Sequence, residues 1–357
     1  MNKMRNVFSG CIPAVKKITC WTVVLSLLSF PAFAEEPLFD MQKVTDGVYA
    51  AIARPIPRGV NSNAAIIICE DGVLVVDSHA KPSAARALIA EIRKITDRPV
   101  RFLVNTHYHP DHVWGNQAYA AAFPREVSII SSEATRDNMI TKSIPALKQQ
   151  RERVQRDVEG LKQRLLAEGD PKVKTQLEMS LAQSVENLKE LNSMDVVLPD
   201  VTLDKSLILH EKERDVLILF LGRGHTSGDV VVYLPKEKIV ATGDMLHGWL
   251  PYLAGEPFPP EWIGTLDRLA KLDFDKVIGG HGEVQSKGRI QFFQDCIRDL
   301  IEETRKAFQR GETAEEAKKS VGSVLAPRYE AGTGGTFWTY FGGDIERIYK
   351  DLAAHTY

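Results

Sequence analysis

The chain has 357 residues, and its 45 basic and 47 acidic side chains give a formal net charge of −2 at pH 7. Hydrophobic residues make up 44% of the sequence, which is typical of a globular protein that buries a sizeable core. The absence of a basic excess disfavours a nucleic-acid-binding protein, because such proteins need a basic surface to meet phosphates.

The first 34 residues have the pattern of a secretory signal peptide. Basic residues between positions 3 and 17 precede the apolar residues 21–30 and the small-residue site Ala32-Phe33-Ala34. This apolar stretch is too short to span a bilayer comfortably. We therefore expect cleavage after Ala34, a periplasmic or secreted mature chain of residues 35–357, and no stable membrane span after cleavage.

Apolar runs bounded by glycine, asparagine or aspartate predict strands in the first half of the mature chain. These runs lie at residues 48–52, 64–69, 73–76, 102–104 and 128–130. Between the third and fourth runs, Ala84, Leu88 and Ile92 recur at helical spacing, which predicts a helix over 83–94.

Three histidines and an aspartate stand close together just after the strand predicted at 102–104. They are His107, His109, Asp111 and His112. Zinc binds imidazole nitrogens and carboxylate oxygens, and a catalytic zinc keeps one position open for water. Alternate side chains share a face in an extended segment. We therefore expect His107 and His109 to point together while Asp111 and His112 turn toward a second position nearby; a solvated turn rich in histidine is the alternative.

Residues 133–195 carry no motif but show two apolar stripes at helical spacing, one from Leu147 to Leu165 and one from Leu177 to Leu191. Gly169-Asp170-Pro171 separates them, with the glycine after one helix and the proline in the first turn of the next. This pattern predicts an inserted antiparallel helical hairpin. It either pads the core, covers the active site, or provides a surface for a homodimer.

The second half repeats the alternation of strands and helices, with strands predicted at 206–209, 216–221, 230–234 and 239–242 and a helix at 261–271. Three apolar runs end in glycine followed by a metal-ligand type of residue. His225 follows the run 216–221, Asp244 follows 239–242, and His281 follows 276–278. Glycine lets the backbone turn sharply beside each of these side chains.

The region from about 286 to 357 is predicted to be a C-terminal helical extension, with helices over 288–309 and 313–321. The aromatic residues Trp338, Tyr340, Phe341 and Tyr349 near its end are interpreted as a packing cluster. Two cysteines lie beyond the signal peptide, Cys69 and Cys296. We expect Cys69 to behave as a small buried hydrophobic residue, and pairing of the two is left open.

With these motifs in this order, the chain resembles the metallo-β-lactamase superfamily, which also includes glyoxalase II-type thioesterases and lactonases. The resemblance covers roughly residues 40–285. It rests on Asp77, on the motif His107–His112 and on His225, Asp244 and His281. It implies an α+β fold, a four-layer αβ/βα sandwich with metals at one edge between its two sheets. The hairpin and the C-terminal helices are then additions to one hydrolase domain.

The resemblance also implies a set of ligands for two zinc ions per chain. One ion is expected to be held by His107, His109 and His225. The other is expected to be held by Asp111, His112 and His281, with Asp244 bridging the pair. Asp77 is expected to hydrogen-bond the loop that carries these ligands and so to fix its geometry. His79 stands where many members of the superfamily have glycine, and the sequence offers no account of it.

The implied chemistry is hydrolysis of a small molecule at a cyclic amide, ester or thioester bond. Two zinc ions generate hydroxide near neutral pH and stabilise the developing oxyanion. Asp111 is expected to orient this nucleophile as well as to bind metal. Asp244 resembles the bridging aspartate of glyoxalase II-type and lactonase-type members. Members that act on β-lactams carry cysteine or serine there, which disfavours β-lactamase activity as the main role, whereas export favours it.

The loop after Asp244 supplies the candidate substrate contacts, His247, Trp249 and Tyr252. A rigid surface loop rich in proline is the alternative interpretation of the segment 248–260. Two other functions remain open from the sequence. One is an iron-dependent persulfide dioxygenase on the same scaffold, and the other is an accessory protein that has the fold without turnover.

Overall fold

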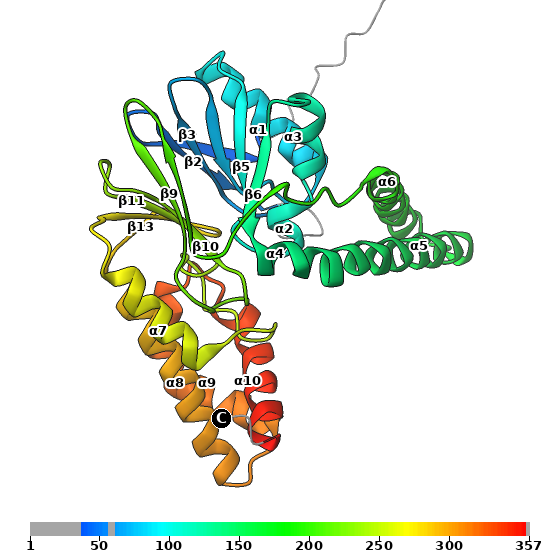
Figure 1. Cartoon of the computed structure of the whole chain (residues 1–357). Coiled ribbons are helices and arrows are strands. Elements are labelled where there is room, and N and C mark those ends of the chain that lie inside the picture. Colours follow the sequence, from blue (N-terminus) through cyan, green and yellow to red (C-terminus); the bar gives the residue numbers. More distant parts are fainter. Residues whose placement is uncertain (1–36, 56–60, 355–357) are drawn as a thin grey trace, which may run out of the picture. The chain divides into compact units, whose positions relative to one another are not determined.

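The computed structural model describes residues 37–55 and 61–354, so the predicted signal peptide lies outside the described residues. These residues form two β-sheets with helices on their outer faces (Figure 1). The first sheet has seven strands in chain order. They are β1 (Phe39–Thr45), β2 (Val48–Ala53), β3 (Ala64–Ile68), β4 (Val73–Val76), β5 (Val100–Val104), β6 (Ser128–Ser132) and β7 (Val201–Leu203).

Strands β4 to β7 run parallel to one another, and helices in the crossovers between them cover one face of the sheet. Helix α1 (Pro82–Ile95) and helix α3 (Asn116–Ala122) pack on this outer face. The period of two along a strand explains how both faces are buried. In β3, Ile66 packs toward these helices while Ile67 packs into the core between the sheets.

The second sheet has six strands in the order β13-β12-β11-β10-β9-β8. Four helices pack on its outer face around a buried cluster that includes Trp262, Phe293 and Phe341. The strands are β8 (Ser206–His210), β9 (Asp215–Phe220), β10 (Val230–Leu234), β11 (Ile239–Gly243), β12 (Lys276–Gly279) and β13 (Gln285–Ser286), and the helices are α7 (Pro259–Ala270), α8 (Arg289–Gln309), α9 (Ala314–Tyr329) and α10 (Phe337–Ala353).

Helix, sheet, sheet and helix make the four-layer sandwich that the sequence predicts. The strand directions bring the ligand motifs together. Strands β4 and β5 are parallel, so their carboxyl ends meet at one edge of the first sheet. In the second sheet β11 is parallel to β12, and β9 has the same direction because β10 is antiparallel to both β9 and β11. All three of these strands therefore also end at a common edge.

The insertion is a helical hairpin that leaves the domain after β6 (Figure 1). It consists of α4 (Glu133–Asn138), a π-helical turn (η1, Met139–Ser143), α5 (Ile144–Ala167) and α6 (Pro171–Ser193). Asp170 caps α6 by accepting hydrogen bonds from the amides of Lys172 and Val173. The apolar stripe predicted from Leu177 to Leu191 has Val185 as one of its members, and this member is wrong, because Val185 is 41% exposed and Ser184 is buried in its place.

Several elements were not predicted from the sequence. They include β1, β7 and the last helix, α10, whose aromatic residues were assigned only to a packing cluster. Cys69 and Cys296 are both free and buried, in different core clusters, so they do not pair. Among the described residues, every helix is too short or too polar to cross a membrane.

Candidate metal centre

The first sheet contributes four ligand candidates from the segment that follows β5. His107 and His109 lie in the loop, and Asp111 and His112 lie in the short helix α2 (Pro110–Val113). Pro110 occupies the first turn of α2. A proline is tolerated there because the amides of a first turn have no hydrogen-bond partner within the helix. The loop extends and then turns, so successive ligands point to two neighbouring positions.

The second sheet contributes His225, Asp244 and His281, each beyond the end of its strand. Glycine is needed beside them. A Cβ atom on Gly280 would lie 2.2 Å from Asp244 Oδ1, and one on Gly243 would lie 2.2 Å from Thr106 Oγ1. Gly243 also has a φ of 52°, a backbone conformation that glycine adopts without strain. The close approach of the two strand ends therefore depends on these glycines.

One group of possible metal ligands consists of His107, His109, His225 and Asp244. His109 Nδ1 and His225 Nε2 lie 2.9 Å apart. Asp244 Oδ2 lies 3.6 Å from His225 Nε2 and 3.9 Å from His107 Nε2. These four atoms come from both sheets and face one another.

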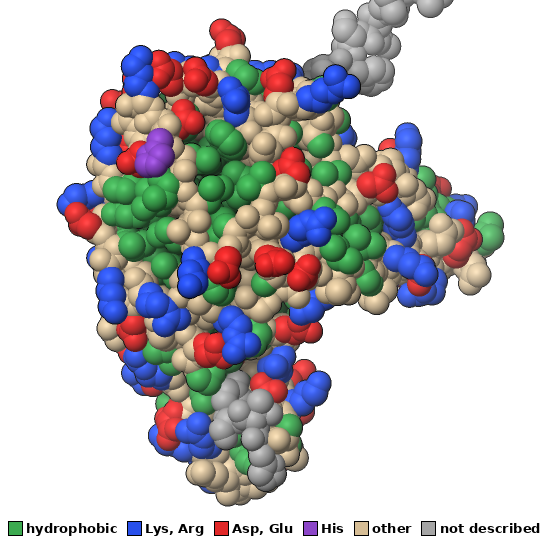
Figure 2. Space-filling model, viewed as in Figure 1, with side chains coloured by type: hydrophobic (Ala, Val, Ile, Leu, Met, Phe, Trp, Pro, Cys, Tyr) green, Lys and Arg blue, Asp and Glu red, His purple; other side chains and the backbone are tan. Residues whose placement is uncertain are grey.

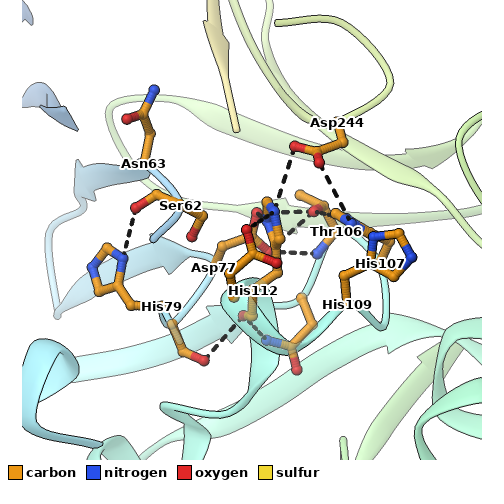
Figure 3. A network of polar contacts seen from close by, with 12 residues as sticks. Ser62, Asn63, Asp77, His79, Thr106, His107, His109, His112 and Asp244 are labelled. Atoms are coloured by element: carbon orange, nitrogen blue, oxygen red, sulfur yellow. Dashed lines mark hydrogen bonds and ion pairs between the residues drawn. The ribbon is translucent and has the colours of Figure 1, made fainter. Parts of the chain in front are cut away.

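The second group consists of Asp111, His112 and His281, and Asp244 approaches it as well. His281 Nε2 lies 3.3 Å from both Asp111 Oδ2 and Asp244 Oδ2. His112 Nε2 lies 3.5 Å from Asp111 Oδ2 and 3.4 Å from Asp244 Oδ1. Asp244 thus presents its carboxylate to both groups, as the resemblance implies for a bridging ligand (Figure 3).

The donor atoms fit a pair of bound cations. Ligand atoms about 2.0–2.2 Å from a tetrahedral zinc lie about 3.3–3.6 Å from one another, close to the separations seen here. Several of these atoms are also buried without a hydrogen-bond partner, namely His107 Nε2, His112 Nε2 and Asp244 Oδ1. A buried polar atom without a partner costs free energy, and coordination of a cation removes that cost. This donor set and the family to which the chain belongs, described below, support a metal cofactor for this protein.

Burial and neighbouring charges shift the pKa values of the side chains in this cluster. Burial lowers the pKa of His107 and His225 well below the usual value, which keeps these imidazoles neutral and able to bind metal. Burial acts against the charged form of Asp111 too, but the charges of His112 and His281 outweigh it and lower the pKa of Asp111 to about 2. The carboxylates therefore remain ionised beside the imidazoles.

Asp77 holds the ligand loop from behind. It follows β4 and is 2% exposed. Its carboxylate accepts hydrogen bonds from the amide and hydroxyl of Thr106, both at 2.8 Å, and from His112 Nδ1, also at 2.8 Å (Figure 3). This last bond fixes which nitrogen of His112 faces Asp244. Asp77 has a φ of 66°, a strained conformation for a residue with a side chain.

His79 turns away from the ligand cluster. Its Nδ1 donates to the carbonyl oxygen of Ser62 at 2.9 Å (Figure 3). The centroid of its ring lies 4.5 Å from that of Phe39. The backbone φ of 71° at His79 accounts for the glycine that many members of the superfamily have there. His79 thus supports the segment around Ser62, a role that the sequence alone did not reveal.

A cavity of about 360 Å³ opens onto the ligand cluster. His109, Asp111, Asp244 and His281 form its polar floor. The three residues predicted to contact substrate all lie on its wall. The complete lining consists of His109, Pro110, Asp111, Asp244, His247, Trp249, Leu250, Tyr252, Gly255, His281 and Tyr340.

Tyr340, which the sequence pattern assigns to the C-terminal packing cluster, reaches the cavity from α10. Trp249 stacks on the ligand His281 with ring centroids 4.3 Å apart and an interplanar angle of 12°. Tyr340 lies 5.9 Å from Trp249 and 5.7 Å from Tyr252, measured between ring centroids. The wall beside the ligands is therefore aromatic.

Comparison with known proteins places this site in a family. Residues 57–281, more than half of the chain, match the model of the metallo-beta-lactamase superfamily. The chain belongs to this superfamily, and in class it is a metal-dependent hydrolase.

Individual relatives are distant. The chain is 24% identical over 313 residues to a linear primary-alkylsulfatase from Pseudomonas sp., a match that covers 80% of this chain but only 54% of that one. It is 21% identical to a metallo-beta-lactamase type 2 from Elizabethkingia meningoseptica, over 78% of this chain and 94% of that one. Among solved structures, a metallo-beta-lactamase from Pontibacter korlensis superposes with a TM-score of 0.54 at 18% identity, over 73% of this chain and 99% of that one.

Proposed function

We propose that the chain is an exported, zinc-dependent hydrolase that cleaves an ester, thioester or cyclic amide bond of a small molecule. The observation that carries this proposal is the carboxylate of Asp244, which faces His225 of one ligand group and both His112 and His281 of the other. A carboxylate shared in this way suits two cations, and we propose two zinc ions per chain. When bound, such a centre supplies an activated water and an electrophile for the substrate carbonyl.

The protein residues then have distinct roles. His107, His109 and His225 hold one cation, while Asp111, His112 and His281 hold the other. Asp111 also lines the cavity and is 18% exposed. This exposure to the cavity supports the proposal that its carboxylate accepts a hydrogen bond from the attacking water and orients it.

Hydrolysis of a sulfate ester is the second candidate reaction. The 24% identity to an alkylsulfatase, over 80% of this chain, favours it. The cavity supports the first candidate, because no Lys or Arg stands among the described residues that line it. Arg and Lys side chains bind tetrahedral oxyanions strongly, so their presence would favour a sulfate ester.

The test starts from the protein purified without chelators. We expect about two zinc ions per chain by elemental analysis, and hydrolysis of at least one lactone, thioester, β-lactam or alkyl sulfate in a panel. The variant His109→Ala serves as control and should lose both metal and turnover. A single iron with oxygen consumption would instead indicate a persulfide dioxygenase. Full metal without turnover on any substrate would indicate an accessory protein.

Export is the part of the proposal that rests on the sequence alone. The predicted signal peptide ends at Ala34, so the protein recovered from its own cells should begin at Glu35. Mass spectrometry of the intact protein checks this, and recovery of the uncleaved chain from the cytoplasm would contradict it.

We also propose that two copies associate through the helical hairpin. Hydrophobic side chains lie among charged ones on this projecting segment (Figure 2). Leu166 is 89% exposed and Met179 is 55% exposed. A two-fold interface uses the same surface on both copies, and it would remove the exposed side chains of Leu166 and Met179 from water.

The double variant Leu166→Glu, Met179→Glu is expected to convert a dimer into a monomer in sedimentation velocity, because it places two charges in the proposed interface. Val324→Glu is the matched control, since Val324 is an exposed hydrophobic residue on α9, 47% accessible. A wild-type chain that sediments as a monomer at all concentrations would remove the proposal.

A further inference from the structure

The C-terminal helices take part in the active-site cavity although they lie outside the region that matches the family. The match ends at residue 281, whereas α8, α9 and α10 occupy residues from 289 to 353. Tyr340 of α10 is half-buried and lines the cavity beside Trp249 and Tyr252. Tyr340, one part of the cavity wall, therefore lies outside the region that matches the family.

The same helices fix the loop that carries the other two aromatic residues. Arg289 of α8 is 7% exposed and donates hydrogen bonds to the carbonyl oxygens of His247 at 2.8 Å and Trp249 at 2.7 Å. Asp344 of α10 is fully buried, and its Oδ1 accepts a hydrogen bond from the amide of Leu253 at 2.7 Å. The loop is thus held at both ends of its aromatic segment.

Among the described residues, the cavity wall is largely aromatic and carries no Lys or Arg side chain. Of the residues that line the cavity, the charged ones are acidic or belong to the ligand cluster. Lys142, on the η1 turn, forms an ion pair with Glu256 rather than standing free. Among these described residues, an anionic tail on the substrate would meet no Lys or Arg side chain, whereas a hydrocarbon chain would be desolvated against three aromatic rings.

We propose that Tyr340 contacts the substrate and determines specificity. With Trp249 and Tyr252 it binds an uncharged hydrocarbon chain on the acyl side of the bond that is cleaved. This inference rests on the proposed hydrolytic function and adds a substrate class to it. Arg289 and Asp344 are positioning residues, because they act only through the loop.

The test compares p-nitrophenyl acetate with p-nitrophenyl octanoate as substrates. The wild type should prefer the octanoate. Tyr340→Ala should lower kcat/KM for the octanoate by about 10-fold and for the acetate by less than about 2-fold, since only the longer chain reaches the ring. Tyr340→Phe keeps the ring and should behave like the wild type. Trp338→Ala is the matched control, because Trp338 lies on the same helix, is 55% exposed and is not part of the cavity lining.

A second comparison addresses charge. The mono-p-nitrophenyl ester of adipic acid carries a carboxylate at its far end, whereas p-nitrophenyl hexanoate does not. The wild type should hydrolyse the uncharged hexanoate better. A preference for the charged ester would overturn the proposed substrate class.

Binding without turnover separates this inference from the proposed function. The ketone 2-decanone has no bond to hydrolyse, and tryptophan fluorescence can follow its binding to the metal-loaded protein. Its Kd should rise about 10-fold in Tyr340→Ala. If ketone binding weakens in this way but no ester is cleaved by any variant, the hydrolytic function fails and the binding site stands. If esters are cleaved with unchanged chain-length preference in Tyr340→Ala, the inference on Tyr340 fails alone.

Discussion

Replacing Asp244 by alanine is expected to lower kcat/KM by about 10³-fold and to reduce the zinc content below two ions per chain. The reason is that Asp244 faces both ligand groups, with Oδ2 3.3 Å from His281 Nε2 and 3.6 Å from His225 Nε2. Its loss removes the single negative charge that the two ligand groups share, and His112 Nε2 loses the Asp244 oxygen at 3.4 Å while it keeps that of Asp111 at 3.5 Å. Elemental analysis and steady-state kinetics on the best substrate of the panel measure both effects.

Asp273→Ala is a suitable control for this prediction. Asp273 is an aspartate of the same domain whose side chain is 75% exposed and pairs with Lys238. Its replacement should change neither quantity, because exposed ion pairs contribute little. Full zinc content in Asp244→Ala would show that the two groups bind metal independently and that the bridging role is wrong.

The second large effect is expected from Asp77→Ala. This change removes the acceptor for the amide and hydroxyl of Thr106 and for His112 Nδ1, all of them buried. Each donor left without a partner costs about 1–3 kcal/mol, so the free energy of unfolding should fall by several kcal/mol. Metal affinity should fall by about 10–100-fold, because His112 loses the partner that orients it.

Denaturant titration and competition with a chromophoric chelator measure these two quantities. Asp71→Ala serves as control, because Asp71 is an exposed aspartate six residues earlier in the chain, after β3. Asp77→Asn adds a further distinction. It keeps one acceptor oxygen for Thr106, so it should recover part of the stability but little of the metal affinity. Equal metal affinity in Asp77→Ala and wild type would contradict the positioning role.

Local patterns explain why much of this architecture was predictable. The strands β4, β10 and β11 are buried on both faces. Each therefore appears in the sequence as a nearly continuous apolar run, which is typical of a buried strand. The ligand cluster is equally local, since His107 to His112 occupy six consecutive positions. The remaining ligands each follow a strand and a glycine, and the superfamily resemblance joined them.

The features that were missed depend on partners far away in the chain. Strand β1 mixes polar and apolar residues, as an edge strand paired on one side does. Helix α10 contains Gly342 and Gly343, which lower its intrinsic helix propensity. It contacts the loop that follows Asp244 through a hydrogen bond from the amide of Leu253 to Asp344, two residues that are 91 positions apart in the chain. No spacing in the sequence indicates such a pairing, and Tyr340 was therefore assigned to the core.

The hairpin illustrates a smaller limit of pattern reasoning. The apolar stripe on α6 places Val185 on the buried face, yet Ser184 is buried there and its hydroxyl donates to the carbonyl oxygen of Ser180. A serine can be buried in a helix when its hydroxyl bonds back to the preceding turn. A pattern of hydrophobic residues therefore cannot predict that Ser184, and not Val185, is buried.

The division of the ligands between two sheets has a thermodynamic consequence. Four of them follow β5 in the first sheet, and three follow β9, β11 and β12 in the second. A cation bound by ligands from both sets cross-links the two sheets of the sandwich. Its binding free energy adds to the cohesion of the halves by linkage, because the unfolded chain cannot assemble the same ligands. Thermal denaturation should therefore report metal occupancy directly, with a melting temperature that climbs as zinc is titrated into the stripped protein.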